Sequence, residues 1–472
     1  MITAPKLTIT EVDCCERSVT LRLPFCYGMV TLLTAPQAFI RVRIRTEDGR
    51  EAWGQAAGVM APKWFDKSPD LSNEANFDQL RRTLALYGEA LSANGAHTAF
   101  GHYASLYKAH IDAAGLEGLN PLVASFGPAL LDRAVFDALC HAHDVSMADG
   151  LCANLAGMRP GDLVTGFEGF NFDGFLAAHE PLSAVHARHT VGFVDPLTTA
   201  DQSAEDRVGD GLPETLEEII ATYGVTYFKI KVAGNLANDV ARLINIAAIL
   251  DRTDAPYHLS IDGNEQYEDA DAALALLAAM RAAPELQRLC NSILFVEQPI
   301  QRTEALSRDM TMLAKAFPVI IDESDADLDA FPRARAQGYT GVSSKNCKGF
   351  YKSLINQARC QIWSAEDGQR YFMTGEDLIC QAGLDVQQDL ALVSFLGINH
   401  VERNGHHYVH GMAGVQEDEQ SDFIDAHPDV YMRHNGQVCV KIEAGRISTK
   451  SLQCTGFGSR VSPVWDAMSQ MR

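Results

Sequence analysis

From residue 188 onward, short runs of β-forming residues alternate with stretches of helical periodicity. The run 227–232 (YFKIKV) is followed by residues 236–252, and the run 257–264 (YHLSIDGN) by residues 271–283; both following stretches have apolar residues at helical spacing. Strand–helix alternation predicts a parallel sheet. Eight β-rich runs occur, over 190–196, 227–232, 257–264, 293–299, 319–324, 340–346, 371–377 and 397–405. Eight units of about 30 residues predict a (β/α)8 barrel of the TIM type, in the α/β class.

An open, doubly wound sheet is the alternative architecture for such a pattern. That fold would be expected to have a glycine-rich phosphate turn after its first strand. No G-x-G-x-x-G sequence follows any of the eight runs. We therefore favour the closed barrel.

The chain before the barrel has a different pattern. Residues 18–23 and 38–46 alternate between apolar and polar side chains, as β-strands with one buried face do. Residues 74–113 and 128–143 have apolar positions at helical spacing. A chain of 472 residues is too long for one ordinary core. We predict a separate α+β domain over residues 1–145.

The remaining boundaries follow from changes in composition. Residues 146–187 are expected to form a linker or insertion, because residues 157–187 are rich in Gly, Phe and His without a clear period. The barrel is expected to span residues 188–410. Residues 411–472 are expected to pack on the barrel and the first domain, with a hairpin over residues 436–449.

The charge and composition exclude several classes of protein. The formal net charge is −22, which repels nucleic-acid phosphates and anionic lipid. No apolar run approaches the roughly 18 residues that span a membrane. The amino terminus alternates like a strand and lacks the pattern of a signal peptide. The 11 cysteines include no C-x-x-C and are interpreted as reduced thiols. We expect a cytoplasmic protein that binds neither nucleic acid nor membrane.

Ionisable residues follow the runs where each strand is expected to end. Catalytic residues of a (β/α)8 barrel cluster at the carboxyl ends of its strands. Lys229 and Lys231 point to the same face of their strand because side chains alternate. These strand-end residues are Lys229, Lys231, Asp262, Glu297, Asp322, Glu323, Lys345, Glu376, Asp377, His400 and Glu402.

Three of these carboxylates, Asp262, Glu297 and Asp322, lie toward the ends of three successive runs. Carboxylates held close together repel one another, and Mg²⁺ is a hard cation that prefers oxygen ligands and keeps several waters. No cluster of thiols or imidazoles lies at these ends, so Zn²⁺ suits them less well. Taken alone, each motif is compatible with an edge strand, a helix cap or a strand that ends at proline. Their order on successive strands predicts a magnesium site.

The ordered set KIK, IDGN, VEQP, IDES and SSKNCK resembles the enolase superfamily, in its muconate lactonizing enzyme and mandelate racemase-like branches. The resemblance covers residues 190–405 and implies that the first domain is a capping domain. It implies that Lys231 and Lys345 are acid/base residues on opposite faces of the substrate, and that Lys229 is an auxiliary lysine. It also implies that Asp262, Glu297 and Asp322 bind Mg²⁺. Asn264 falls in the family's D-x-N stretch and is expected to bind the substrate.

The resemblance implies abstraction of the proton α to a carboxylate, through a metal-stabilised enediolate. With a lysine on each face, an isomerase is expected: a racemase, epimerase or cycloisomerase. A lyase or dehydratase of a hydroxy or sugar acid is the alternative. Lys345 and Glu376 stand where the racemase and many dehydratases pair an Asp with a His, which argues against a dehydratase. A non-catalytic binding protein on the same fold is the second alternative.

Substrate contacts are expected from the first domain. The loops at 23–31 and 61–67 are rich in aromatic and small residues, and they offer Tyr27, Lys63 and Trp64. Ordinary loop packing is the alternative interpretation, because aromatic side chains also bury well in small domains. Glu376 and Glu402 are expected either to contact the substrate or to hold a lysine.

The histidines of residues 400–410 fit no usual spacing of metal ligands and are interpreted as part of a polar loop. We expect a small-molecule carboxylate as the substrate and a homo-oligomer as the assembly.

Overall fold

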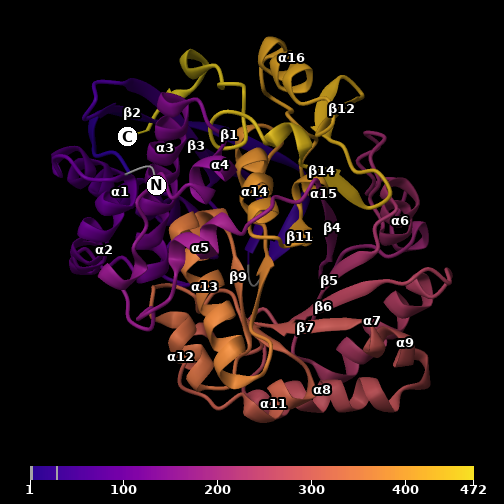
Figure 1. Ribbon diagram of the computed structural model, residues 1–472. Coiled ribbons are helices and arrows are strands. Elements are labelled where there is room, and N and C mark those ends of the chain that lie inside the picture. Colours follow the sequence, from indigo (N-terminus) through magenta and orange to yellow (C-terminus); the bar gives the residue numbers. More distant parts are fainter. Residues whose placement is uncertain (1–3, 28–29, 472) are drawn as a thin grey trace.

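The computed structural model describes residues 4–27 and 30–471, apart from the side chains of residues 26, 27 and 30. Eight parallel strands form a barrel in which each strand pairs with the next along the chain and β11 pairs back with β4 (Figure 1). Because the sheet closes on itself, the barrel prediction is confirmed and the open doubly wound alternative is wrong. The strands are β4 (Ala184–Val191), β5 (Tyr227–Lys231), β6 (His258–Asp262), β7 (Ile293–Glu297), β8 (Val319–Ile321), β9 (Gly341–Ser344), β10 (Phe372–Gly375) and β11 (His400–Arg403).

Each of the eight predicted runs contains all or part of one barrel strand, and the largest difference is at β4. This strand begins at Ala184, six residues before the predicted run 190–196. Its first six residues, AVHARH, include two histidines and one arginine and therefore lack the apolar signal of a buried strand. The part that the pattern missed contains the residues that pair with β11 and close the barrel.

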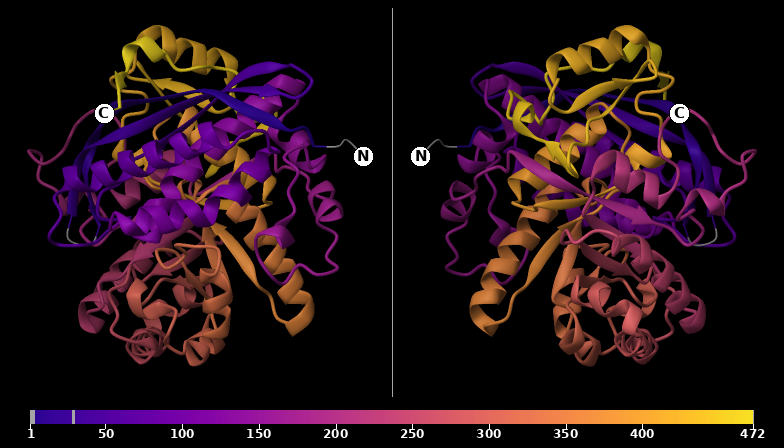
Figure 2. Two further views of the ribbon diagram at one scale, coloured as in Figure 1. Left: turned by 90° about the vertical axis from the view of Figure 1, so that its left-hand side faces the viewer. Right: turned by 90° about the vertical axis from the view of Figure 1, so that its right-hand side faces the viewer.

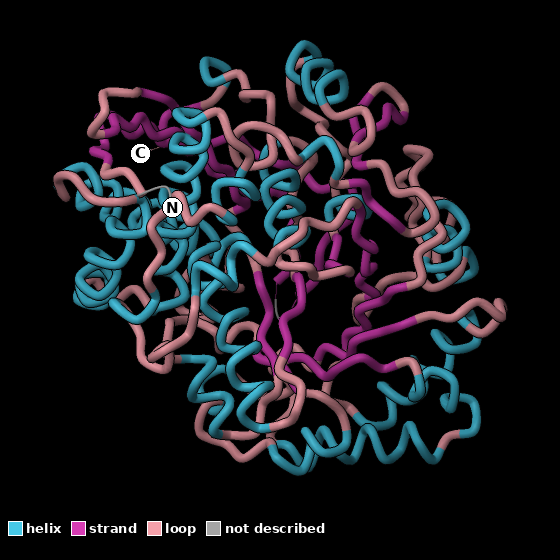
Figure 3. Tube along the Cα trace, viewed as in Figure 1, coloured by secondary structure: helices cyan, strands magenta, loops and turns pink. Residues whose placement is uncertain are grey.

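Helices surround the barrel strands, as Figure 3 shows in cyan around magenta. Helix α7 illustrates why they form: the Asn235 side chain caps its first turn by accepting from the Asn238 N–H, and Leu243, Ile246 and Leu250 are buried on one face. The larger barrel helices are α6 (Leu216–Tyr223), α7 (Leu236–Leu250), α8 (Ala270–Ala282), α11 (Thr311–Ala316), α12 (Ala330–Ala336), α13 (Phe350–Asp367) and α14 (Leu384–Phe395). Shorter helices are α9 (Gln287–Asn291), α10 (Arg302–Ala305) and α15 (Gly405–Tyr408).

The N-terminal part is an antiparallel sheet covered by three helices. Its strands are β1 (Leu7–Tyr27), β2 (Val30–Thr46) and β3 (Glu51–Val59), and its helices are α1 (Asn73–Ala93), α2 (Ala99–Leu116) and α3 (Pro121–His143). Helix α3 is buried from Leu122 to Cys140, because it packs on the sheet, on α1 and α2, and on the barrel. Strand β3 approaches it so closely that a Cβ on Gly54 would lie 2.1 Å from the Ala138 nitrogen.

The stretch 157–187 contains helix α5 (Phe172–Ala177) and a cluster of phenylalanine rings, and it follows the short helix α4 (Met147–Cys152). Phe172 and Phe175 lie 5.3 Å apart between ring centroids, and Phe170 lies 5.7 Å from Phe175. His179 stacks on Phe395 of α14 at 4.6 Å. The aromatic residues that showed no period in the sequence therefore pack with one another and against the barrel.

The C-terminal segment returns to both other parts of the chain. It contains α16 (Glu417–Ala426), β12 (Tyr431–His434), β13 (Gln437–Val440), β14 (Arg446–Ser448) and β15 (Ser469–Gln470). Strand β14 pairs with β4 and strand β15 with β1. The N-terminal sheet and this segment lie at one end of the molecule, with the red and orange barrel units at the other (Figure 2).

The hairpin predicted over residues 436–449 does not form as such, because β13 and β14, the two strands of this segment, pair with β12 and β4. Strand β13 pairs with β12, and the turn between them is Asn435-Gly436, where both residues have positive φ (46° and 82°). An Asn-Gly pair is the strongest short-range hairpin signal. It lies at the start of the predicted segment, so the hairpin spans residues 431–440 and only its second strand lies within that segment. In the described part of the chain, no helix has the length and apolar character needed to cross a membrane.

Candidate active site

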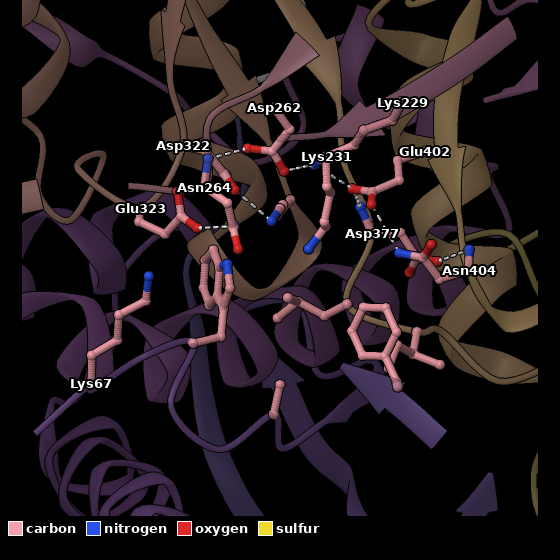
Figure 4. A pocket seen from close by; sticks show the side chains of 16 residues that line it. Lys67, Lys229, Lys231, Asp262, Asn264, Asp322, Glu323, Asp377, Glu402 and Asn404 are labelled. Atoms are coloured by element: carbon pink, nitrogen blue, oxygen red, sulfur yellow. Dashed lines mark hydrogen bonds and ion pairs between the residues drawn. The ribbon is translucent and has the colours of Figure 1, made fainter. Parts of the chain in front are cut away.

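The carboxyl ends of the barrel strands and two segments of the N-terminal domain surround a pocket (Figure 4). The barrel contributes lysines and carboxylates, and the N-terminal domain contributes Phe25, Ala61, Trp64 and Lys67. The charged lining residues from the barrel are Lys229, Lys231, Asp262, Asp322, Glu323, Lys345, Asp377 and Glu402.

Lys229 lies at the centre of a buried carboxylate cluster. Its Nζ is 2.8 Å from Glu297, 3.1 Å from both Glu376 and Glu402, and 3.2 Å from Asp262. Burial disfavours the charged ammonium, but the four carboxylates outweigh burial and hold the pKa of Lys229 well above its ordinary value. Lys229 is therefore a charged structural centre of the site.

Glu297 is the carboxylate of this cluster that is least well satisfied. Burial, followed by repulsion from Glu376, raises the pKa of Glu297 well above its ordinary value. Its Oε1 accepts from Lys229, but its buried Oε2 has no hydrogen-bond partner among the described residues. Glu297 Oε2 can therefore accept one further hydrogen bond or coordinate a cation.

Asp322, on the other side of the pocket, is held by two lysines. Lys345 Nζ lies 2.7 Å from Oδ2, and Lys348 Nζ lies 3.0 Å from Oδ1 and 2.8 Å from the Asp322 carbonyl oxygen. Burial would raise the pKa of Asp322, but Lys345 and Lys348 outweigh it and lower the pKa well below its usual range. Sequence reasoning missed Lys348; the K-x-x-K spacing in SSKNCK, which places both lysines around one short helical turn, was the available signal.

Lys231 differs from the other two barrel lysines that line the pocket, Lys229 and Lys345. Its side chain lies beneath the Phe25 ring, with Nζ 5.5 Å from the ring centroid. Within the described residues, its ammonium makes no hydrogen bond or ion pair, although the side chain is almost wholly buried and lines the pocket. Lys231 is therefore held by packing and remains available to a bound molecule.

Asn264 and Glu323 form a polar wall beside Asp322. The Asn264 backbone has a positive φ of 44°, which lets its N–H donate to Asp262 (2.7 Å) while its side-chain amide donates to Glu323 (3.2 Å). Burial, then repulsion from Asp322, raises the pKa of Glu323 to about 7. Sequence reasoning named Glu323 as a strand-end residue but gave it no role.

Glu402 and its neighbours form the opposite wall. Glu402 accepts from Thr190 (2.7 Å) and from the Asn404 side chain (2.9 Å), and Asp377 accepts from the Asn404 N–H (2.8 Å). Burial would raise the pKa of Glu402, but Lys229 and Lys345 outweigh it and lower the pKa well below its usual range. Asn404 was missed; its place two residues after Glu402 in HVERNG was the available signal.

The substrate contacts predicted from the sequence have different outcomes. Trp64 and Asn264 line the pocket. Lys63 does not: its ammonium donates to the carbonyl oxygens of Ser68 (2.6 Å) and Leu71 and so stabilises its own loop. Glu376 does not line this pocket either, because it is buried between Arg188 and Lys229. The side chain of Tyr27 lies outside the described residues.

The predicted metal ligands lie on adjacent strands, with Asp262 in register with Glu297. In the described chain, no group of three or more His, Cys, Asp or Glu side chains is gathered closely enough to hold a metal ion. Lys229 contacts Asp262 and Glu297, while Lys345 and Lys348 contact Asp322. An all-oxygen donor set and the unpartnered Glu297 Oε2 nevertheless fit a hard divalent cation, so the magnesium site stays a prediction.

Comparisons with known proteins agree with this geometry. The family model described as "Enolase C-terminal domain-like" matches residues 211–349, and a search of curated proteins found no match. A dipeptide epimerase from Enterococcus faecalis is similar in structure, with 15% identity, a TM-score of 0.61, and coverage of 96% of this chain and 99% of that one.

Two further solved structures are similar along nearly their whole length. A mandelate racemase/muconate lactonizing protein from Herpetosiphon aurantiacus has 17% identity and a TM-score of 0.59, over 96% of this chain and 99% of that one. The L-Ala-D/L-Glu epimerase from Bacillus subtilis has 16% identity and a TM-score of 0.55, over 93% and 99%. Residues 211–349 therefore match the enolase C-terminal domain-like family, and the chain shares its fold with these solved structures along nearly its whole length.

Proposed function

We propose that this protein is a magnesium-dependent isomerase that removes and returns the proton α to a carboxylate, with Lys231 and Lys345 as its acid/base pair. One observation carries the proposal: β5 and β9 stand four strands apart in the eight-stranded barrel, so their lysines reach one pocket from opposite sides. A proton taken on one face of a planar intermediate and returned on the other inverts the carbon atom. That outcome is racemisation or epimerisation.

Asp262, Glu297 and Asp322 are the residues that would hold Mg²⁺. When bound, the ion would supply positive charge to the carboxylate oxygens of the substrate, where negative charge develops as the α-proton leaves. The buried Glu297 Oε2, which lacks a partner among the described residues, supports this role. The structure of the similar dipeptide epimerase is titled as a complex with Mg and the dipeptide L-Leu-L-Tyr.

The residues of the chain itself would have separate roles in the reaction. Lys231 and Lys345 exchange a proton with the α-carbon, one from each side. Lys229 fixes the carboxylates of Glu297 and Glu402 and supplies a fixed positive charge beside them. Phe25 and Trp64 exclude water above the two lysines, which strengthens the electrostatic interactions in the site.

A lyase that uses the same first step is the second candidate, since an enediolate with a leaving group on the β-carbon eliminates it. The paired lysines favour the isomerase, because elimination needs no second amine to return a proton to the α-carbon. A non-catalytic binding protein would have no need for two buried lysines that open into the same pocket.

The test is exchange of the α-proton in D2O, followed by NMR over a library of small carboxylates in the presence of Mg²⁺. We expect exchange with inversion for at least one compound, and loss of this reaction in Lys231→Ala. Lys441→Ala, at an exposed ion pair with Glu443, is the matched control. Exchange that survives in Lys231→Ala would contradict the assigned base, and an eliminated product would favour the lyase.

A further inference from the structure

Two aromatic side chains of the N-terminal domain each cover one of the pocket lysines. The Phe25 ring centroid lies 5.5 Å from Lys231 Nζ, and the Trp64 ring centroid lies 4.3 Å from Lys345 Nζ. Phe25 belongs to β1 and Trp64 to the loop after β3, so the two rings come from separate segments. An aromatic face attracts a nearby cation and also keeps water from it.

Arg302 fixes the segment that contains Trp64. Its Nη1 donates to the Trp64 carbonyl oxygen at 2.8 Å, while its Nε and Nη2 bind the Glu265 carboxylate at 2.9 and 2.8 Å. Lys67, three residues after Trp64, forms an ion pair with the same carboxylate. Bidentate, charge-assisted hydrogen bonds are strong and directional. The barrel loops after β6 and β7 therefore hold the Trp64 loop through one arginine.

Arg22 fixes the segment that contains Phe25. Its Nε and Nη2 bind the Asp210 carboxylate at 2.5 and 2.8 Å, and its Nη1 donates to the His407 carbonyl oxygen at 2.8 Å. The Arg22 side chain is only 4% exposed. Phe25 follows three residues later and packs edge-on against Tyr408, the neighbour of His407, at 4.5 Å. The loop after β4 and helix α15 thus hold the end of β1.

We propose that Arg22 and Arg302 are positioning residues, each of which sets one aromatic ring over one lysine and thereby controls proton transfer at one face of the substrate. The inference rests on the proposed function. Each arginine contacts barrel loops on one side and a segment of the N-terminal domain on the other. Because the contacts of the two arginines do not overlap, loss of one is expected to disturb one lysine and to leave the other in place.

The test compares the two stereoisomers of a substrate. Lys231→Ala and Lys345→Ala first establish which isomer loses its α-proton to which lysine. Arg302→Gln is then expected to slow exchange of the isomer served by Lys345, and Arg22→Gln that of the other isomer. A misplacement of about 1 Å can cost up to about a hundredfold in rate, and we expect each selective loss to be about tenfold or more. The ratio of the two rates should therefore move in opposite directions in the two variants.

Two measures separate this effect from general destabilisation. Arg335→Gln is the matched control, because Arg335 also binds a carboxylate (Asp367, 2.9 Å) and lies over an aromatic ring (Trp363, 4.7 Å) but does not line the pocket. It should leave both rates unchanged. Where Arg22→Gln fails to fold, Asp210→Asn removes the same charge pair, and where Arg302→Gln fails to fold, Glu265→Gln does so. Each replacement should shift the ratio of the two exchange rates in the same direction as the arginine variant. Equal slowing of both isomers by either variant would overturn the proposal.

A second readout needs no turnover. Amide hydrogen exchange of residues 61–67 should increase in Arg302→Gln, and that of residues 20–25 in Arg22→Gln, each without a change in the other segment. Unchanged protection would overturn the proposal whether or not the enzyme acts on any carboxylate. Absence of α-proton exchange in the unmodified protein, with these changes in protection present, would count against the proposed function and leave the positioning contacts supported.

Discussion

At the scale of single residues, the lysines of the site are shared unequally among its carboxylates. Lys229 contacts four buried acidic side chains, whereas Lys345 and Lys348 share one, Asp322. A buried charge is tolerated only when it is paired and hydrogen-bonded. The same lysine that the proposed chemistry uses as an auxiliary cation therefore also stabilises the fold.

Removal of that ammonium should be costly. Lys229→Met keeps the length of the side chain but leaves Glu297, Glu376 and Glu402 without their shared cation. We expect a loss of about 3–5 kcal/mol in the free energy of unfolding, measured by urea denaturation at pH 8, since breaking a buried ion pair has a cost of this size. The loss should be smaller at pH 5, where the released carboxylates protonate more readily.

The control for this change is Lys441→Met, at the exposed Lys441–Glu443 pair. Surface substitutions of this kind usually change stability by no more than about 0.5 kcal/mol. A similar effect of the two substitutions would contradict the structural role of Lys229.

At the scale of elements, the close approach of β3 to α3 joins the N-terminal sheet to the helix that faces the barrel. A Cβ on Gly54 would meet the backbone of α3, 2.1 Å from the Ala138 nitrogen and 2.2 Å from the Ala134 oxygen. Backbone atoms of a buried helix cannot move aside as a side chain can. Glycine is therefore required at this position by packing.

Gly54→Ala should lower stability by at least about 2 kcal/mol, within the range seen when a packed core is overfilled. Gly58→Ala is the matched control on the same strand, because its Cβ would meet only the flexible end of Leu130, at 3.3 Å. The two midpoints of thermal unfolding provide the measurement. A drop for Gly58→Ala as large as that for Gly54→Ala would show that glycine in β3 matters for another reason.

Two buried histidines of helix α15 make the stability of the folded protein depend on pH. Burial is the main cause that lowers the pKa values of His406 and His407 to about 3 each. Both imidazoles are neutral in the folded state above that value, whereas in the unfolded chain they gain a proton below about pH 6.5. Between these values the unfolded state binds more protons, so stability falls as the pH falls.

We expect each histidine to contribute a slope of about 1.4 kcal/mol per pH unit between about pH 6 and 4. His407→Gln, whose side chain does not titrate, should flatten the curve of unfolding free energy against pH by about that amount. His434→Gln is the control, because His434 lies in the hairpin formed by β12 and β13. An unchanged slope in His407→Gln would contradict this assignment.

At the scale of the whole molecule, three parts far apart in sequence meet around one pocket. The chain ends beside its beginning, since β15 pairs with β1, and α16 is tied to β1 by the Arg17–Glu419 ion pair at 3.1 Å. The pocket lies where the N-terminal domain covers the barrel mouth. A cation bound by the ends of β6, β7 and β8 would join three barrel strands at that mouth, so its binding should stabilise the whole molecule.

Addition of Mg²⁺ should therefore raise the midpoint of thermal unfolding, and removal by a chelator should reverse the rise. A ligand present at 100 times its dissociation constant stabilises the folded state by about 2.7 kcal/mol. Glu297→Gln should abolish the Mg²⁺-dependent shift, because it removes the acceptor that is best placed to bind a cation. Glu443→Gln should retain the shift. An equal shift in Glu297→Gln would show that Glu297 is not a ligand of the metal ion.

The expected homo-oligomer stays a prediction, to be measured by light scattering.

Much of the fold was predictable because its signals are local. The eight β-rich runs, the helices between them and the Asp, Glu and Lys residues at their ends are visible in short windows of sequence. The errors arose where a segment depends on a distant partner. The early part of β4 depends on pairing with β11, and β14 depends on pairing with β4. The tertiary structure also decides where Lys63 and Glu376 lie: loop carbonyl oxygens bind Lys63, and Glu376 holds a lysine, Lys229, which is one of its two expected roles.

The sequence by itself determined the barrel and the order of charged groups around its mouth, because parallel strands place their carboxyl ends at one edge and side chains alternate along each strand. Only the tertiary structure decided which amine pairs with which carboxylate and which ring covers which lysine. Those choices depend on contacts such as Arg22 with His407 and Arg302 with Trp64, between residues hundreds of positions apart. No local pattern specifies such a contact, because it exists only after the separate parts of the chain have packed together.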